Sequence, residues 1–171
     1  MRLFIAVEIP KEIQEELRSL QKEFRGLAKI KFVGKFHLTL KFLGDVQEDK
    51  VDEIKRRLKE ISFKPFDQII ENIGVFPNED KIKVIWVGVF SKEINNLQGK
   101  IDDKLSDLFP RDNLFIPHLT LGRVKFIKKK EELKEKLKLK YSNIFKVDNF
   151  KLILSYPDKG AYKYRILETF S

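Results

Sequence analysis

The sequence predicts an α+β fold whose sheets are mainly antiparallel and whose chain forms two related lobes. Segments rich in Ile, Val, Phe and Tyr, which favour strands, outnumber the amphipathic helical segments. Several of these segments follow one another across a short turn, which indicates hairpins and argues against a doubly wound parallel sheet. The tetrapeptide His-Leu-Thr-Leu, which begins at His37 and again at His118, places one copy in each half of the chain.

The chain begins with a strand that we expect to be buried on both sides, because residues 3–9 place apolar side chains on both faces. A helix then starts at Pro10 and ends near Gly26. Two further amphipathic helices are expected at about 48–61 and 94–108. Strands are expected at about 29–33, 36–43, 66–75, 81–90, 118–126, 145–155 and 161–169.

Turn-forming residues indicate two hairpin loops, FPNEDK at 76–81 and YPDKGAY at 156–162. The charge-rich segment 128–140 carries two leucines four residues apart, which favours a solvated helix over a dedicated RNA-binding tract. The resulting order is β-α-β-β-α-β-β-α-β-α-β-β, and we expect one bilobal domain over residues 1–171.

The composition excludes several classes of function. The chain has no cysteine, which removes disulfides, thiolate nucleophiles and cysteine-based metal sites. No Gly-rich phosphate loop follows a strand, so no nucleotide cofactor is expected. No segment has the length of a membrane span or a secretory signal, so we expect a cytoplasmic protein that does not enter a membrane. The formal charge of +9 suits a nucleic-acid partner, although a Lys- and Glu-rich chain is also typical of proteins from hot environments.

The repeated tetrapeptide predicts a polar face above an apolar back. Side chains two residues apart share one face of a strand, so His37 and Thr39 lie together while the two leucines face the core. The same alternation pairs His118 with Thr120. Each lobe would therefore present a His-Thr pair to a groove between the lobes.

Two imidazoles facing one groove fit an in-line displacement at phosphorus. One imidazole can take a proton from the attacking hydroxyl while the other gives a proton to the departing oxygen. The two threonine hydroxyls can donate to the non-bridging oxygens, where charge develops. A metal site is the weaker interpretation, because no carboxylate in either motif completes a two-histidine ligand set. A lone histidine would more often be a structural residue, but duplication of the His-x-Thr unit favours function.

The segments FHLTLKFLGDV at 36–46 and FIPHLTLGRVK at 115–125 closely resemble the two His-x-Thr-x motifs of the two-histidine phosphoesterase superfamily. The resemblance is strongest to the RNA 2′,3′-cyclic phosphodiesterases, also called 2′-5′ RNA ligases. The opening RLFIAVEIP and the ending GAYKYRILETF also resemble that family's first and last strands. Two departures, Ala161 in place of a frequent Pro and the lack of a frequent Arg-Ser before the last hairpin, bear on substrate detail more than on chemistry.

The resemblance implies two sheets related by a pseudo-twofold axis, helices on the outer faces and a central cleft. It implies metal-free opening of a terminal 2′,3′-cyclic phosphate on RNA to a 2′-phosphate, and reverse ligation that forms 2′-5′ linkages without ATP. It suggests His37 as proton donor to the leaving 3′ oxygen and His118 as proton acceptor from water. The residues alone leave this assignment open, because the two sites are alike.

Neighbouring residues extend the candidate site. Thr39, Thr120 and Arg123 are candidate phosphate contacts; simple alternation would turn Arg123 toward the core, unless Gly122 supports a bulge that turns it back. Phe42, at the equivalent offset after His37, could stack on a base, although core packing is the stronger interpretation. Two lysines, Lys41 and Lys125, are candidate groove charges.

The expected partners are RNA 3′ ends that carry a cyclic phosphate, bound by a monomer without a metal or other cofactor. Two alternatives stay open from the sequence. One is a two-histidine phosphoesterase for another cyclic or 2′-5′-linked nucleotide, and the other is an RNA-end binding module without turnover.

Overall fold

The structure, a computed structural model, describes residues 1–171 and contains nine strands and four α-helices. The strands are β1 (Arg2–Glu8), β2 (Ala28–Phe32), β3 (His37–Asp45), β4 (Phe66–Asn78), β5 (Lys81–Phe90), β6 (His118–Ile127), β7 (Ser142–Val147), β8 (Phe150–Asp158) and β9 (Ala161–Phe170). The helices are α1 (Lys11–Lys22), α2 (Val51–Lys59), which follows a 3-10 turn at Glu48–Lys50, α3 (Lys92–Leu105) and α4 (Lys130–Lys136).

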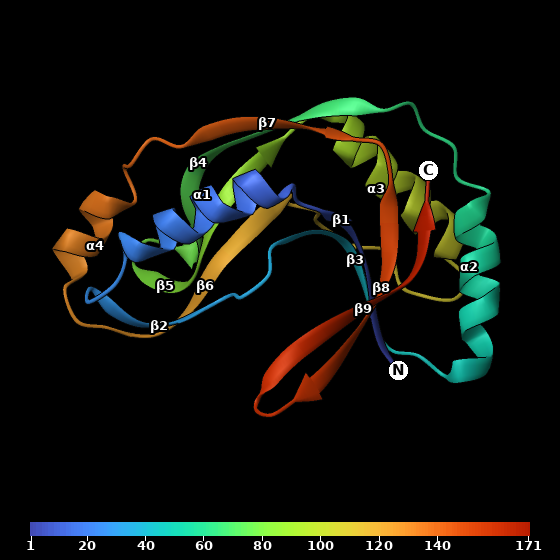
Figure 1. Ribbon diagram of the computed structural model, residues 1–171, viewed down its shortest axis with the longest axis horizontal. Helices are drawn as coiled ribbons and strands as arrows, with labels where there is room; N and C mark the ends of the chain where they lie inside the picture. Colours follow the sequence, from blue (N-terminus) through green and yellow to red (C-terminus); the bar gives the residue numbers. More distant parts are fainter.

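The strands form two sheets, and every pairing between neighbouring strands is antiparallel, which confirms the predicted fold class. One sheet has the order β3-β1-β8-β9 and the other β2-β6-β5-β4-β7 (Figure 1). We call the first sheet with α2 and α3 the His37 half, and the second sheet with α1 and α4 the His118 half. The two orders match strand for strand, β3-β1-β8-β9 with β6-β5-β4-β7, and β2 is added outside β6.

The first strand is buried on both faces, as predicted. Leu3, Ile5 and Val7 join a core cluster of 36 buried residues that includes members of both sheets and all four helices. Phe4 and Ala6, on the other face, form a separate small cluster with Ile153 of β8. Burying β1 from both sides fixes the strand that pairs directly with β3, so the backbone of β3 has a rigid neighbour.

The helices cover the apolar backs of the sheets. Helix α1 lies against β6 and ends at Lys22, and Gly26 in the turn that follows has a φ of +80°, the left-handed conformation that glycine adopts without strain. Helix α3 begins at Ser91, whose hydroxyl accepts a hydrogen bond from the backbone N–H of Ile94. It packs against β3 and beside α2. None of the helices has both the length and the apolar character needed to cross a membrane.

The strand predicted at 145–155 is wrong, because the chain there forms two strands in different sheets. Strand β7 pairs with β4 in the His118 half, and β8 pairs with β1 in the His37 half. The chain crosses between the halves at Asp148 and Asn149. No Gly or Pro marks the crossing, and its local signal is limited to the turn-forming pair Asp148 and Asn149, which the prediction missed.

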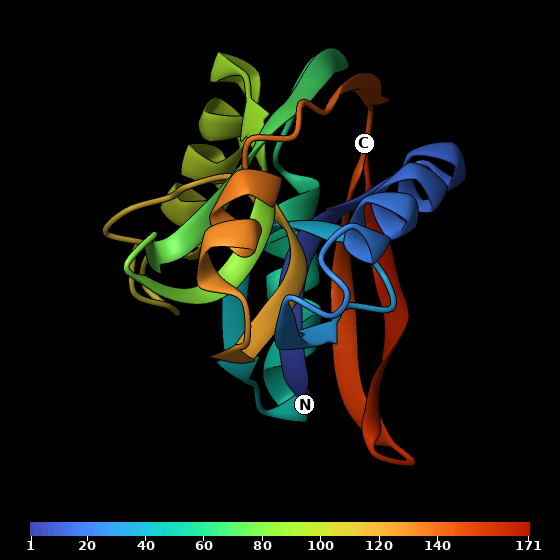
Figure 2. The same ribbon diagram turned by 90° about the vertical axis from the view of Figure 1, so that its left-hand side faces the viewer.

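Both predicted hairpins are present, with turns shorter than expected. The strands continue through most of the predicted loop residues, which leaves only Glu79–Asp80 and Lys159–Gly160 outside them. Lys159 and Gly160 both have positive φ, which matches the twist of a tight hairpin. The β8–β9 hairpin projects beyond the body of the molecule (Figures 1 and 2).

Candidate active site

A bulge in β3 arranges the residues of the first motif. The register against β1 pairs Ala6 with Thr39 and Ile5 with Lys41, so Leu40 is the extra residue. Leu40 and Lys41 are therefore both buried, and the next residue returns to the face that carries His37 and Thr39. That residue is Phe42, whose side chain is 69% exposed, so the interpretation of Phe42 as a core residue is wrong.

A matching bulge in β6 arranges the second motif. The register against β5 pairs Trp86 with Thr120 and Ile85 with Gly122, and both Leu121 and Gly122 are buried. Arg123 is consequently exposed on the face of His118 and Thr120, which confirms the bulge expected at Gly122. A Cβ at Gly122 would lie 2.5 Å from Cγ2 of Ile30 on β2, so only glycine fits there.

His37 lies in an aromatic environment. Its ring meets Tyr164 of β9 edge to face at a centroid distance of 4.9 Å, and Phe4 of β1 at 5.5 Å. Its Nε2 is buried and has no hydrogen-bond partner in the protein. Glu8 stands opposite His37 in the register and is ion-paired with Lys35 and Lys151. No protein hydrogen bond at Nε2 therefore fixes the tautomer of His37.

His118 has a similar aromatic support and a different polar contact. Phe76 meets the ring edge to face at 5.0 Å, and Trp86 lies 6.2 Å away. The Nδ1 of His118 lies 2.7 Å from the carbonyl oxygen of Ile116. A carbonyl can only accept, so Nδ1 carries the proton and Nε2 of neutral His118 holds a free lone pair.

Burial lowers the pKa of both histidines. For His37, burial is the largest cause, the charge of Lys35 adds to it and Glu8 partly opposes it, which together bring the pKa from 6.5 to about 4. Burial is also the main cause at His118; the Ile116 carbonyl opposes this lowering of its pKa, and the nearby charge of Arg123 adds to it. Without substrate, His37 is neutral at physiological pH.

Lys41 is not a groove charge, and this prediction is wrong. Its side chain is 2% exposed, on the back of β3, where it forms an ion pair with Asp102 of α3 and donates to the carbonyl oxygen of Pro110 at 2.8 Å. Asp102 also accepts from the backbone N–H of Asp112. The segment held by these bonds leads directly to His118, so this buried cluster connects the strand of one histidine with the approach to the other. Lys125, in contrast, is exposed as expected.

Four contacts of the histidines were not identified from the sequence: Tyr164, Phe4, Phe76 and Trp86. Alternation within each strand could place an aromatic residue on a face, but only the pairing of β1, β9, β4 and β5 with their neighbours brings these rings to the histidines. Gly74 is part of this arrangement, because the ring of Trp86 occupies the space where a Cβ would project.

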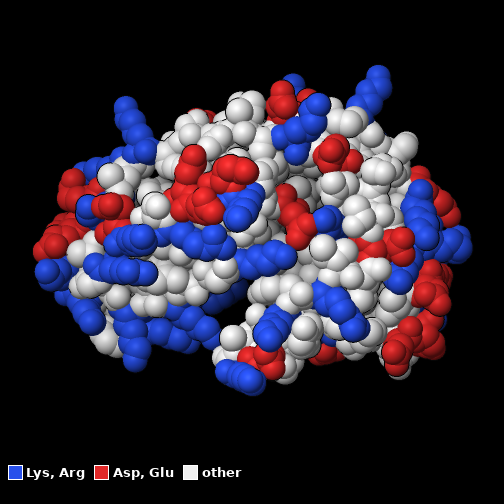
Figure 3. All heavy atoms as spheres, in the orientation of Figure 1, with Lys and Arg blue, Asp and Glu red and all other residues white.

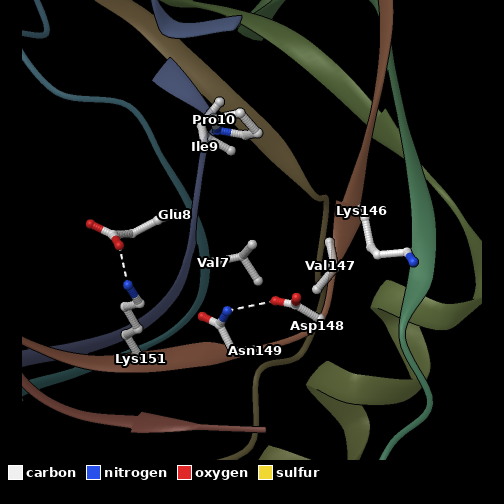
Figure 4. Close-up of a pocket in the computed structure, with 9 residues that line it drawn as sticks. All are labelled: Val7, Glu8, Ile9, Pro10, Lys146, Val147, Asp148, Asn149 and Lys151. Atoms are coloured by element: carbon white, nitrogen blue, oxygen red, sulfur yellow. Dashed lines mark hydrogen bonds and ion pairs between the residues drawn. The ribbon is translucent and has the colours of Figure 1, made fainter. Parts of the chain in front are cut away.

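A polar pocket of about 260 Å³ lies beside the site at the junction of β1, β7 and β8. Figure 4 shows Glu8 paired with Lys151 at one side and Asp148 with Asn149 at the other. Neither histidine lines this pocket. No group of three or more His, Cys, Asp or Glu side chains is placed to hold a metal ion.

The two motif strands meet where the halves of the molecule join. Strands β3 and β6 are in contact although they belong to different sheets. Gln21 of α1 donates to the carbonyl oxygens of Leu121 on β6 and of Val33, which precedes β3. Figure 3 shows that the surface is hollowed between the halves, at the lower edge of the view.

The comparisons with known proteins agree with this geometry. The family described as LigT-like phosphoesterase matches the chain twice, over residues 7–86 and 88–161, and each match contains one motif. The chain is similar to the RNA 2′,3′-cyclic phosphodiesterase of Methanocaldococcus jannaschii, with 40% identity over 98% of this chain and 99% of that protein. It is also similar to the enzyme of that name from Archaeoglobus fulgidus, with 42% identity over 73% of each chain.

Solved structures show the same fold. A Thermus thermophilus protein superposes with a TM-score of 0.84 at 26% identity, over 99% of this chain and 97% of that one. Escherichia coli LigT, crystallised with 3′-AMP, superposes with a TM-score of 0.76 at 21% identity, over 98% and 95% of the two chains.

Proposed function

The chain belongs to the LigT-like phosphoesterase family, and from this we propose that it is a metal-independent RNA 2′,3′-cyclic phosphodiesterase. The observation that carries the proposal is the pair of equivalent strands, each with a bulge that presents a His-Thr pair on one face. The relatives that match nearly full length carry the name of this activity. We also propose that the protein is a cytoplasmic monomer and that residues 1–171 form one bilobal domain.

The reaction exchanges one P–O bond for another. A water oxygen attacks phosphorus, His118 takes the water proton, the bond from phosphorus to O3′ breaks, and His37 gives a proton to O3′. The products are a 2′-phosphate and a free 3′-hydroxyl. A 5′-hydroxyl in place of water gives a 2′-5′ linkage by the same step, without ATP.

The tautomer of His118 supports its role as acceptor. With Nδ1–H bound to the Ile116 carbonyl, the free lone pair of Nε2 can receive a proton, and the carbonyl then stabilises the imidazolium. His37, with a pKa of about 4, must gain a proton before it can donate one. A bound phosphate supplies the negative charge that raises this pKa, so substrate binding prepares the donor.

The remaining site residues divide into phosphate contacts and a base contact. Thr39 and Thr120 donate to the non-bridging oxygens, and Arg123 pairs with phosphate charge. Phe42 offers an exposed ring for a base beside His37. In this proposal the reacting phosphate lies between the two His-Thr pairs, with the base toward Phe42 in the His37 half and Arg123 toward the phosphate from the His118 half.

A substrate with sulfur in place of the leaving 3′ oxygen tests the proposal and the two roles. Thiolate leaves without protonation, so we expect His37→Ala to recover most of its lost rate on the sulfur substrate, while His118→Ala recovers none. Recovery in His118→Ala alone would reverse the roles. Loss of wild-type turnover in chelator, restored by a divalent ion, would contradict the metal-independent mechanism.

A further inference from the structure

A strip of five basic residues runs from the candidate site along the outer edge of the His118 half. In the register, Lys31 of β2 stands opposite Arg123 of β6, and Lys29 stands opposite Phe126. Residues opposite each other in an antiparallel pair share a face, so these side chains extend the face that carries His118. We call the set the basic strip; it consists of Lys29, Lys31, Arg123, Lys125, Phe126 and Lys128.

The cations of the basic strip have no acidic partners. None of the five forms an ion pair with a carboxylate, whereas the neighbouring Lys129 and Lys136 pair with Glu132 and Glu23. The cations near His37 also have an acidic partner, because Lys35 and Lys151 are both ion-paired with Glu8. Like charges crowded on one strand pair repel each other, and a bound polyanion removes this cost.

An exposed aromatic ring lies within the strip. Phe126 is 53% exposed, and the ammonium groups of Lys29 and Lys128 lie 5.9 and 6.0 Å from its ring centroid. Sites for single-stranded nucleic acid combine positive charge, which follows the backbone, with aromatic faces on which bases stack. Figure 3 shows blue side chains gathered at the lower left, over the region where Figure 1 places β2 and β6.

We propose that the basic strip binds the RNA chain that lies 5′ of the cyclic phosphate. The inference rests on the proposed function and names the substrate as an oligonucleotide. From Arg123 to Lys128 the extended strand covers roughly 16 Å, which gives several phosphates a cationic partner. Arg123 lies close enough to lower the pKa of His118, so the strip is continuous with the site.

The β8–β9 hairpin is the other surface that could bind the RNA chain. Tyr162 is exposed there with Arg2 over its ring at 5.7 Å, but Lys163 at the turn is paired with Asp158. Arg2, Lys159 and Arg165 of this region form no ion pair, but the strip gathers five unpaired cations around one exposed ring, so charge complementarity to a phosphate backbone favours the strip.

Equilibrium binding of an RNA hexanucleotide that ends in a 2′-phosphate tests the inference. The variant Lys29→Gln/Lys128→Gln is compared with Lys64→Gln/Lys92→Gln, a control that removes the same charge from exposed positions outside the strip. We expect the strip variant to weaken hexanucleotide binding about tenfold and to reduce the slope of log affinity against log salt by roughly 1.4. The control should match wild type, and Phe126→Ala should weaken binding without changing the slope.

The outcomes separate the inference from the proposed function, because binding does not require turnover. Equal binding by the strip variant and the control would overturn the inference, as would a loss of binding in Tyr162→Ala but not in the strip variant. A wild-type protein that binds the hexanucleotide through the strip but opens no cyclic phosphate, on an oligonucleotide or on a mononucleotide, would contradict the proposed function alone. Cyclic mononucleotide turnover at the wild-type rate in Lys29→Gln/Lys128→Gln would show that this variant keeps an intact catalytic face.

Discussion

The His37 half and the His118 half share one backbone arrangement, but different side chains surround the two histidines. In each half a bulge three residues after the histidine turns the fifth residue onto the face that carries the histidine. In β3 that residue is Phe42, and in β6 it is Arg123. The residue opposite the histidine also differs, being Glu8 for His37 and Gly88 for His118.

The difference between Phe42 and Arg123 shows how a nearly symmetric scaffold can hold an asymmetric substrate. A displacement at phosphorus needs similar groups on opposite sides, and in the proposed mechanism the duplicated His-Thr pairs supply them. A nucleotide has a flat base at one end and charged phosphates at the other. Beside His37, Lys35 and Lys151 are ion-paired with Glu8, whereas Arg123 and the lysines of the basic strip form no ion pair, so substitutions in the two halves should have different effects.

The largest effect should come from the histidines themselves. We expect His37→Ala and His118→Ala each to lower the rate of cyclic phosphate opening by about 10²-fold or more, because each removes a proton-transfer group. Steady-state rates with a cyclic mononucleotide give the measurement, and circular dichroism checks the fold. A folded variant of either histidine with nearly wild-type turnover would remove that half from the mechanism.

The next effect concerns how the two bulges are supported. Lys41 occupies in β3 the position that Gly122 occupies in β6, and it is paired in the core with Asp102. Lys41→Met leaves that carboxylate buried without its cation, which should lower the free energy of unfolding by about 3–5 kcal/mol. Urea denaturation measures the loss. The double variant Lys41→Met/Asp102→Leu should recover much of the lost stability, because it also removes the buried carboxylate. The control Lys125→Met, at an exposed lysine, should change the free energy of unfolding little. Equal losses in Lys41→Met and Lys125→Met would refute the ion-pair account.

A smaller effect should distinguish the residues at the fifth position. Phe42→Ala should weaken productive binding of a cyclic mononucleotide by about 1–3 kcal/mol, with a loss that depends on the base, because stacking differs among bases. Arg123→Gln should weaken all bases alike, because phosphate charge is common to them. The measurement is kcat/KM for the four cyclic mononucleotides. A base-independent loss in Phe42→Ala would show that its ring does not contact the base.

The smallest effect is a difference in proton affinity between the halves. Burial and Lys35 hold the pKa of His37 at about 4, whereas the Ile116 carbonyl opposes the lowering at His118. An NMR titration of the free protein, which has only two histidines, should show His37 gaining its proton at lower pH. Glu8→Gln removes a carboxylate that favours imidazolium, so it should lower the pKa of His37 further, by less than about one unit, and leave His118 unchanged. Coincident titrations would contradict the asymmetry.

Local pattern was sufficient to predict which residues share a face of each motif strand. The side chains of a strand alternate between faces, so the sequence alone places each histidine with its threonine and turns the intervening leucines to the core. The same rule predicts a first strand buried on both sides, and turn-forming residues predict both hairpins. These features depend on residues within a few positions of one another.

Features that depend on a partner strand or helix were decided only by the tertiary structure. The register of β3 against β1 and of β6 against β5 sets the bulges that expose Phe42 and Arg123. Simple alternation would place Lys41 on the face of His37, but the bulge in β3 turns it to the back of the strand, where Asp102 of α3 pairs with it. The segment 145–155 divides between two sheets because β4 and β1, distant in sequence, provide the pairing edges. A sequence read along one segment contains none of these contacts, since each requires a residue that folding brings from elsewhere in the chain.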